Sequence, residues 1–265
     1  MLLSLALLVT QSSVQSFDVD GVRREALVFT GKGPGPHPLV LAFHGHGGNM
    51  RQASRSFRAH EHWPEATVVY PQGLPTKGTY DPQGAKPGWQ QKAGDDGDRD
   101  LRFVDAILAS IKDVDRKRTF AMGHSNGGRF TYVLWGSRGD NFAAYGPSGS
   151  PAIGMIRRFK PASVFATAGE TDRLVPYAGQ RMTIQALARL NGADLASGTK
   201  NGYVTLAKGR DGLEVGTYIH PGGHEYPSEA ARATVELFKR VRRGPGTSLQ
   251  PCPSKSSCRV PSLPA

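Results

Sequence analysis

The chain has 265 residues, of which 38% are hydrophobic and 21% charged, and this composition excludes a protein that is disordered throughout. Its length is enough for one large domain with a full core. The formal net charge is +11, but the basic residues are scattered and no stretch interleaves them with aromatic ones, so we expect no nucleic-acid partner.

The beginning of the chain has the pattern of an export signal. Residues 2–9 are almost wholly apolar, and small or polar residues follow up to Ser16. We interpret residues 1–16 as a signal peptide and predict a secreted protein. No Lys or Arg precedes Arg23, which is unusual for such a signal, and a buried edge element is the alternative. The apolar run is too short to cross a bilayer, so we expect no stable membrane insertion.

The catalytic domain is expected to cover residues 17–243. Residues 24–30 are predicted to form an edge strand, and the continuous apolar run 38–43 is typical of a strand covered on both faces. That run leads into His44-Gly45-His46-Gly47-Gly48, and such a loop lets the backbone approach a substrate carbonyl. We predict the His46 backbone N–H as one oxyanion-hole donor. A metal site formed by His44 and His46 is the alternative, but neighbouring carboxylate or thiolate ligands are lacking, so we expect no metal and no cofactor.

A long irregular segment, residues 75–94, follows a short predicted strand at residues 67–70. It contains Tyr80 and Trp89, and long loops at a sheet edge are often functional. These aromatic residues either line a cleft or hold the loop in place. We assign Trp89 to substrate binding.

A cluster of four acidic residues suggests a calcium-binding loop, formed by Asp95, Asp96, Asp98 and Asp100. The spacing fails, because Leu101 stands where a calcium loop needs glycine. Apolar residues at helical spacing follow instead, and we expect the acidic residues to cap that helix and complement its dipole.

The pattern Gly-x-Ser-x-Gly at residues 123–127 comes directly after a β-prone apolar run and directly before a helical pattern. This context is typical of a nucleophile elbow, with Ser125 as the nucleophile. Side chains at Gly123 and Gly127 would collide with a neighbouring strand or helix. The first helical turn directs N–H groups at developing negative charge, and we predict the Asn126 backbone N–H as the second oxyanion-hole donor.

The second half of the chain alternates strands and helices. Strands are predicted at residues 142–145, at 163–168 and within 202–219, with helices at 182–190 and 228–242. This order predicts one doubly wound, mostly parallel α/β domain. The short spacing between the strands at 142 and 163 leaves no room for a large cap, so we expect an open cleft.

The last residues, 244–265, are rich in Pro and Ser and are predicted to form a flexible tail. Both cysteines of the chain, Cys252 and Cys258, lie there. Export would allow them to pair.

A serine hydroxyl needs a base, and the base needs an orienting carboxylate. In a doubly wound α/β domain with such a nucleophile elbow, the three residues follow one another along the chain in the order Ser, then Asp or Glu, then His. Ser125, Asp172 and His224 fit that order, and each follows an apolar run in a loop that contains glycine. Glu170 and His220 are the alternatives for the acid and the base.

Taken together, Gly-His-Ser-Asn-Gly-Gly, His-Gly-x-Gly-Gly, Asp172-x-x-Val-Pro-Tyr and Gly-Gly-His224-x-Tyr226-Pro resemble the secreted poly(3-hydroxybutyrate) depolymerase and feruloyl esterase family. The resemblance covers about residues 22–241. It implies a single-domain α/β-hydrolase fold without a large cap, a Ser-Asp-His triad and ester hydrolysis through an acyl-enzyme. Tyr226 stands where this family often has Trp, and we assign it to substrate binding.

The resemblance leaves the substrate open among a polyester, a feruloylated or acetylated plant polysaccharide and a small acyl ester. A serine peptidase or acyltransferase is the first alternative. The second is a polymer-binding protein without activity on a hydrolase scaffold. We expect an ester as the only partner and a monomeric protein.

Overall fold

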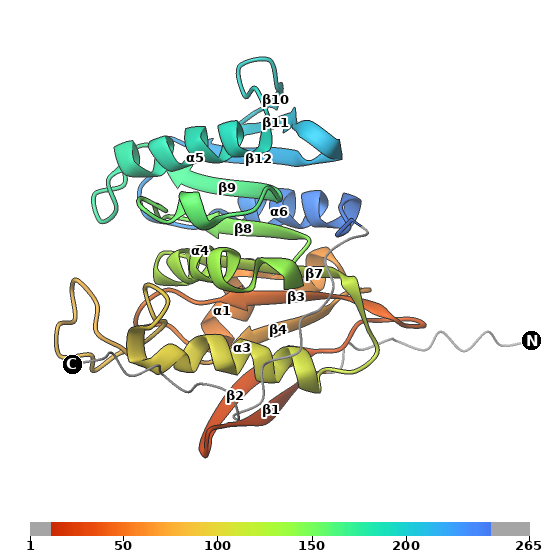
Figure 1. The fold of residues 1–265 in the computed structure, drawn as a ribbon, viewed down its shortest axis with the longest axis vertical. Helices are drawn as coiled ribbons and strands as arrows, with labels where there is room; N and C mark the ends of the chain where they lie inside the picture. Colours follow the sequence, from red (N-terminus) through yellow and green to blue (C-terminus); the bar gives the residue numbers. More distant parts are fainter. Residues whose placement is uncertain (1–11, 245–265) are drawn as a thin grey trace, which may run out of the picture.

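A ten-stranded sheet organises the protein, whose structure is a computed structural model that describes residues 12–244 (Figure 1). The strands β4, β3, β7, β8, β9 and β12 run parallel, and antiparallel strands flank them at both edges. All carboxyl ends of the parallel strands therefore meet at one edge of the sheet. In spatial order the strands are β1 (Ser12–Val19), β2 (Val22–Phe29), β4 (Thr67–Pro71), β3 (His37–Phe43), β7 (Val114–His124), β8 (Ala144–Ser148), β9 (Ser163–Gly169), β12 (Glu214–His220), β11 (Val204–Lys208) and β10 (Thr199–Asn201).

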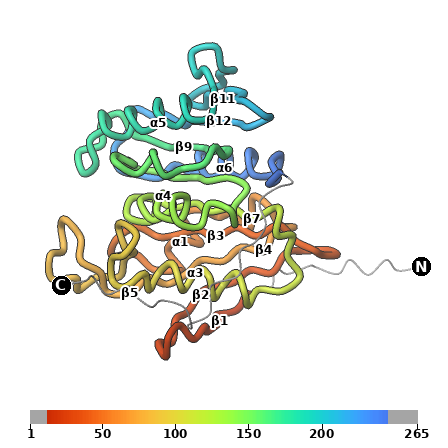
Figure 2. The backbone as a smooth tube through the Cα atoms, viewed as in Figure 1, coloured from red at the N-terminus to blue at the C-terminus, as the bar shows by residue number. Residues whose placement is uncertain are grey.

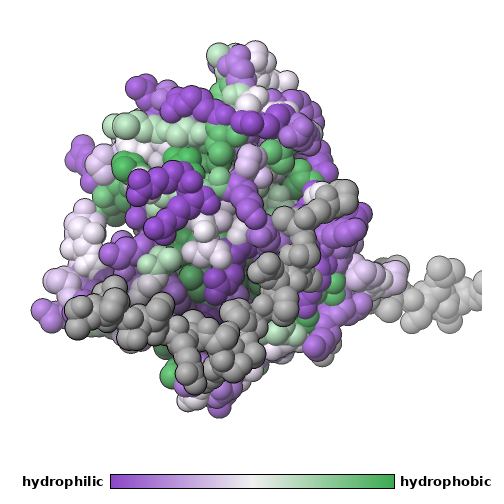
Figure 3. Space-filling model, viewed as in Figure 1, coloured by the Kyte–Doolittle hydropathy of each residue, from purple (hydrophilic) through white to green (hydrophobic). Residues whose placement is uncertain are grey.

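Helices cover both faces of the sheet, as the alternating pattern predicts. One face packs against α3 (Arg99–Ser110), α4 (Asn126–Arg138) and α5 (Tyr177–Asn191). The other packs against α1 (Met50–Phe57), the short α2 (Ala59–His62) and α6 (Ser228–Arg240). The outer surface over α3, α4 and α5 is mixed, with hydrophilic side chains at its rim and hydrophobic ones between the helices (Figure 3).

The strand β3 shows why its sequence is a continuous apolar run. All its residues are buried. Leu39, Leu41 and Phe43 belong to the core under α3, α4 and α5, whereas Val40 and Ala42 belong to the core under α1 and α6. Alternate side chains of a strand point to opposite faces, so a strand covered on both sides has to be apolar throughout.

The edge of the sheet differs from the prediction. Residues 24–30 were expected to form an edge strand, but β2 is paired on both sides, with β1 and with β4. The edge strand β1 takes in residues 12–16 of the predicted signal peptide, so cleavage after Ser16 would cut this strand within its ladder. Residues 1–11 and 245–265, with Cys252 and Cys258, lie outside the described part of the chain. No helix within residues 12–244 is long and apolar enough to cross a membrane.

The irregular segment 75–94 projects beyond the carboxyl edge of the sheet (Figure 2). Two very short strands, β5 (Leu74–Pro75) and β6 (Pro87–Gly88), bring its ends together. Between them the Asp81 carboxylate accepts hydrogen bonds from the Ala85 and Lys86 backbone N–H groups at 3.1 and 2.8 Å. Polar contacts within the segment therefore help to hold it, and apart from these two short strands it has little regular secondary structure.

A buried ion pair joins β2 to the start of α3. The Arg24 guanidinium donates to Asp100 at 2.9 Å, and both side chains are almost wholly buried. The second Asp100 oxygen accepts from the Gln90 backbone N–H at 2.8 Å. Asp100 thus fixes the end of the irregular segment as well as the helix.

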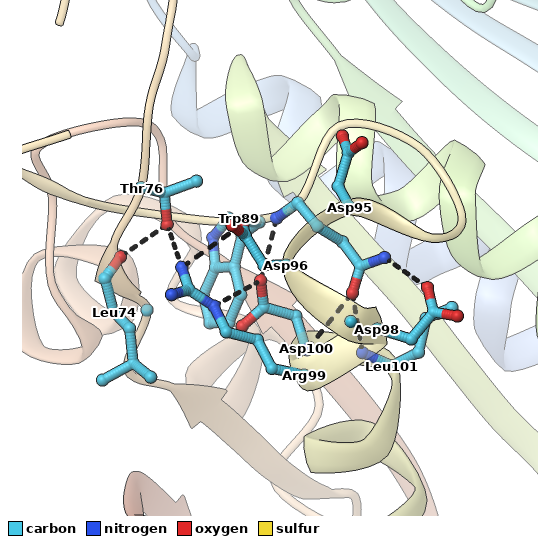
Figure 4. Close-up of polar contacts among 12 residues, drawn as sticks. Leu74, Thr76, Trp89, Asp95, Asp96, Asp98, Arg99, Asp100 and Leu101 are labelled. Carbon is cyan, nitrogen blue, oxygen red and sulfur yellow. Dashed lines mark hydrogen bonds and ion pairs between the residues drawn. The ribbon is translucent and has the colours of Figure 1, made fainter. Parts of the chain in front are cut away.

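The start of α3 corrects the expectation that acidic residues cap this helix. Asp98 occupies the N-cap position but makes no capping hydrogen bond with its side chain. Instead, Gln90 Oε1 accepts from the backbone N–H groups of Asp100 and Leu101, both at 3.2 Å (Figure 4). The Asp98 carboxylate accepts from the Gln90 side chain and from the Gly94 backbone N–H, so it stabilises the preceding loop.

Removing one partner of the buried ion pair should destabilise the fold strongly. We expect Arg24→Ala to lower the free energy of unfolding by about 3–5 kcal/mol, because it removes the nearest cation of a buried carboxylate and leaves only the more distant Arg99, at 3.8 Å. The matched control is Arg23→Ala, which breaks the exposed pair of Arg23 with Glu25 and should cost about 0–1 kcal/mol. Urea unfolding of both variants measures the difference, and equal losses would contradict this account of Asp100.

Candidate active site

Ser125 lies at the turn between β7 and α4 in a strained backbone conformation. Its φ of 58° and ψ of −121° are uncommon for a residue with a side chain. The turn is fixed because the Ser125 N–H donates to the Ser148 carbonyl at 2.8 Å. A Cβ atom on Gly123 would clash with the Gly127 carbonyl, and one on Gly127 with the Phe43 carbonyl. The glycines therefore let the turn approach β3 closely, as the sequence pattern predicts.

The structure brings together the three residues that were predicted as a triad. His224 follows β12, and its Nε2 lies 2.8 Å from the Ser125 hydroxyl oxygen. On the other side of the ring, His224 Nδ1 lies 2.7 Å from an Asp172 carboxylate oxygen. The two hydrogen bonds form a continuous chain from a buried carboxylate through an imidazole to a hydroxyl, which is the geometry needed to remove a proton from the hydroxyl.

Asp172 is held on both of its oxygens. Oδ1 accepts from the backbone N–H groups of Leu174 and Val175 at 2.9 and 2.8 Å. Oδ2 accepts from Gln180 at 3.0 Å in addition to His224. Burial by itself raises the pKa of this carboxyl, but the hydrogen bonds from His224 and Val175 outweigh it and the pKa is lowered. Asp172 therefore stays ionised beside the ring.

The alternatives for acid and base occupy other places. Glu170 is exposed, and its backbone N–H donates to the His220 carbonyl at 2.8 Å. His220 is buried within β12, and its Nδ1 lies 3.6 Å from the Glu225 carboxylate. The contacts with Ser125 are made by His224.

A second histidine, His124, supports His224, a role that the sequence pattern did not indicate. The His124 ring lies 4.8 Å from the His224 ring, measured between centroids. Its Nε2–H donates to the His224 backbone carbonyl at 2.9 Å, and its Nδ1 accepts from the Ser148 hydroxyl at 3.1 Å. Burial lowers the pKa of His124 to about 4, so the ring is neutral at pH 7 and can make both bonds.

The glycine-rich loop after β3 is anchored by its two histidine side chains. His44 Nδ1–H donates to the Gly45 carbonyl at 2.7 Å, and Nε2 accepts from the Gly73 N–H at 3.0 Å. Burial lowers the pKa of His44 to about 4. His46 Nε2 lies 3.0 Å from the Asp81 carboxylate of the irregular segment. Both rings are therefore used in holding loops together, and within residues 12–244 no group of three His, Cys, Asp or Glu is placed to hold a metal.

The predicted oxyanion-hole donors flank Ser125. Gly45 lies against the serine, since a Cβ atom built on it would be 3.4 Å from the Ser125 Cβ. Asn126 is the first residue of α4, where backbone N–H groups and the helix dipole favour negative charge. Neither the His46 nor the Asn126 backbone N–H donates in the hydrogen bonds between described residues, so both remain available to a ligand.

Trp89 does not line the cleft, contrary to the prediction. It is fully buried, with its ring stacked on Phe130 and edge-on to Phe43. Its indole N–H donates to the His44 carbonyl at 2.9 Å. The Trp89 backbone N–H donates to Asn126 Oδ1 at 2.7 Å, and its carbonyl accepts from Asn126 Nδ2 at 3.0 Å. The packing thus makes Trp89 a support that ties the irregular segment to the elbow.

Tyr226 does lie at the cleft. Its ring packs edge-on against Phe57 of α1, with centroids 4.9 Å apart, and tilted against His124. A cavity of about 360 Å³ opens here, lined by the glycine-rich loop, the α1 face, Ser125, His224 and Tyr226. The cavity has a partly apolar wall beside the hydroxyl of Ser125, which suits a carboxylic ester.

No model of a protein family matches the chain. It is 28% identical over 202 residues to a probable feruloyl esterase C of Aspergillus clavatus, covering 71% of this chain and 69% of that protein. It is also 28% identical over 168 residues to a bifunctional acetylxylan esterase/xylanase of Neocallimastix patriciarum, covering 59% of this chain but only 22% of that protein.

Solved structures of esterases superpose on most of the chain. A thermostable esterase gives a TM-score of 0.61 at 18% identity, covering 88% of this chain and 63% of that one. An acetyl xylan esterase from Aspergillus awamori gives 0.59 at 16% identity, covering 86% and 99%. The chain has the α/β-hydrolase fold. Between β8 and β9 the described chain holds no large cap, as expected, because residues 149–162 contain only a short 3-10 helix, Ile156–Arg158.

The two neutral histidines His44 and His124 should make the stability of this protein depend on pH. Burial lowers the pKa of His44 and of His124 from 6.5 to about 4. Between these values the unfolded chain binds protons that the folded protein does not, so the free energy of unfolding falls as pH is lowered from 6.5 through 4. Each ring should contribute a loss of roughly 3 kcal/mol.

Urea unfolding at about pH 7 and about pH 4.5 measures this loss. The matched variant is His124→Gln, whose amide can still donate to the His224 carbonyl but does not titrate. It should lose less stability than the unaltered protein over the same interval. An equal loss in both proteins would show that His124 is not the titrating group.

Proposed function

We propose that this protein is a serine esterase that hydrolyses feruloyl or acetyl esters of plant polysaccharide through an acyl-enzyme. The observation that carries the proposal is the chain of hydrogen bonds from Asp172 through His224 to Ser125, at 2.7 and 2.8 Å. Every member of that chain is held by further contacts of its own, so the arrangement exists before any substrate binds.

In the first half of the reaction, the Ser125 oxygen attacks the ester carbonyl carbon while His224 Nε2 takes the hydroxyl proton. The resulting oxyanion accepts hydrogen bonds from the His46 and Asn126 backbone N–H groups, each contributing about 3 kcal/mol. The imidazolium then gives its proton to the leaving alcohol, and Asp172 stabilises its charge. The product is an alcohol and an ester of Ser125.

In the second half, water replaces the alcohol. His224 takes a proton from the water molecule as its oxygen attacks the acyl carbon, and it returns this proton to the Ser125 oxygen when the acyl bond breaks. The carboxylic acid leaves and the free enzyme is restored. His124 has no part in proton transfer in this scheme, because its Nε2–H is directed to the His224 backbone carbonyl.

The names of the sequence relatives support the choice of substrate. The Aspergillus relative is named a probable feruloyl esterase and the Neocallimastix relative an acetylxylan esterase/xylanase. An open cleft without a large cap suits an ester attached to a long chain. Hydrolysis of methyl ferulate, acetylated xylan and polyhydroxybutyrate, measured side by side, tests the proposed substrate. If only polyhydroxybutyrate is hydrolysed, the substrate is a polyester and the proposal of a polysaccharide ester is wrong.

The other candidate functions differ in what they turn over. A peptidase would cleave a chromogenic peptide faster than p-nitrophenyl acetate or butyrate, and an acyltransferase would pass the acyl group to an added alcohol in preference to water. A polymer-binding protein without activity would turn over none of these compounds.

Export is part of the proposal and rests on the apolar run at residues 2–9 and on the resemblance to a secreted family. Expression in a secreting host and sequencing of the mature amino terminus test it. A protein that stays inside the cells with an uncleaved start would contradict it.

Ser125→Ala should abolish hydrolysis and leave the fold intact, because it removes only a hydroxyl at the cleft. Losses for a triad serine run to about 10⁶ in kcat. The rate with p-nitrophenyl acetate, measured beside a thermal unfolding curve, checks both statements. A folded variant that keeps more than about a tenth of the activity would exclude Ser125 as the nucleophile.

Asp172→Asn should lower kcat by about 10³ to 10⁴, because a carboxamide favours the wrong tautomer of His224. The matched control is Glu170→Gln, which makes the same chemical change at an exposed carboxylate two residues away. Its kcat should stay close to that of the unaltered enzyme. If the change at Glu170 is the more damaging one, the assignment of the acid is wrong.

A further inference from the structure

A second cavity, of about 480 Å³, lies beyond the cleft and has no part in the chemistry described so far. It is bounded by the irregular segment 75–94, the turn before α3 and the first turns of α4. Side chains that project into or border it include Thr76, Lys77, Gln91, Lys92, Asp96 and Arg129.

This polar cavity is adjacent to the active site. Arg129 lies one helical turn after Ser125, and its backbone N–H donates to the Ser125 carbonyl at 2.8 Å. On the other side, Lys77 is followed by Gly78, and a Cβ atom on Gly78 would be 3.2 Å from the His46 ring. Arg129, which lines the polar cavity, is thus in contact with Ser125, and Lys77 adjoins a residue that lies beside His46. Ser125 and His46 both line the cleft.

The polar cavity differs from the cleft in the kinds of side chain that line it. It contains hydroxyl, amide, carboxylate, ammonium and guanidinium groups but no aromatic or aliphatic side chain. An aromatic acyl group would find no aromatic side chain to stack against here. A sugar, which presents several hydroxyl groups that both donate and accept, would find partners of both kinds.

Several of these groups are free to bind a ligand. The Lys77 ammonium and the Gln91 side-chain amide form no hydrogen bond or ion pair with another residue of the described chain. Arg129 is anchored through Nε to the Gln91 carbonyl and through Nη1 to the Pro151 carbonyl, both at 3.0 Å. These bonds hold its guanidinium in place, and Nη2 donates in no hydrogen bond between described residues.

The walls of the cavity are held by buried polar contacts. Gln90 is fully buried, and its amide donates to the Lys92 carbonyl at 3.0 Å and to the Asp98 carboxylate at 2.8 Å. Arg99 crosses to the opposite wall, where it donates to the Pro75 carbonyl at 2.9 Å and to the Thr76 hydroxyl (Figure 4). A cavity with fixed walls loses little entropy when it binds a ligand.

We propose that the polar cavity binds sugar residues of the polysaccharide next to the esterified one. This inference rests on the proposed function, because it places the sugar chain beside the ester bond that Ser125 attacks. Binding there raises the local concentration of the ester without touching the reacting atoms, so it acts mainly on KM.

The test compares long and short esters in variants of the cavity. The variants Lys77→Ala and Gln91→Ala each remove a free polar group, and Lys200→Ala removes an exposed lysine on β10 as a matched control. For each protein, kcat/KM is measured with a feruloylated xylo-oligosaccharide and with methyl ferulate. The ratio of the two should fall about fivefold to tenfold in each cavity variant through KM and stay unchanged in the control.

A second measurement needs no hydrolysis. Titration calorimetry of the Ser125→Ala protein with unesterified xylohexaose should show binding that weakens in the cavity variants. Inorganic phosphate serves as a second probe, because Lys77, Lys92 and Arg129 could attract an anion. Phosphate binding without xylohexaose binding would overturn the inference, and so would a ratio that the cavity variants leave unchanged. A protein that binds xylohexaose but cleaves no ester would overturn the proposed function, while sugar binding in the polar cavity would still hold.

Discussion

The arrangement of residues at the carboxyl edge of the sheet depends on one constraint, the close approach of the Ser125 turn to β3 and β8. The turn needs a positive φ at a residue that has a side chain, and it needs glycine on both sides, where carbonyl groups of Phe43 and of the elbow itself fill the space of a Cβ atom. That backbone conformation is unfavourable by itself and persists because the sheet around it is rigid. Once the turn is in place, the parallel strands bring the loops that hold Asp172 and His224 to the same edge.

Neutral imidazole rings connect these loops to each other. A neutral ring offers one donor and one acceptor on opposite sides, so it can join two groups that each need one partner. His44 joins the glycine-rich loop to Gly73, and His124 joins the β8 end to the backbone of His224. Burial keeps both rings uncharged, and charge on either would remove its acceptor. The same low polarity that favours their neutral form also strengthens the hydrogen bond between Asp172 and His224.

The central part of the fold could be predicted from the sequence, because buried parallel strands have to be apolar runs and the elbow needs its glycines. The order of Ser125, Asp172 and His224 along the chain was also sufficient to select residues that the structure brings together. What the sequence could not show depends on contacts between distant segments. The His124 ring meets a carbonyl one hundred residues further along, and β1 is only partly buried, so its polar residues hide the strand pattern. The prediction that Trp89 binds substrate was wrong, because an aromatic residue in a loop has the same local sequence whether it lines a cleft or packs beneath one.

The burial of Trp89 also explains how the irregular segment can be long and still precise in its placement. Its indole and backbone groups bond to both His44 and Asn126, so the segment is fixed to the residue that follows β3 and to the start of α4. From that fixed point the chain continues in one direction to Asp81, which holds the His46 side chain, and in the other to Gln90, which holds the start of α3. Any shift of this segment would therefore move the glycine-rich loop and the polar cavity together. The placement of the loop beside Ser125 and the placement of the polar cavity are thus coupled through Trp89, which is fully buried.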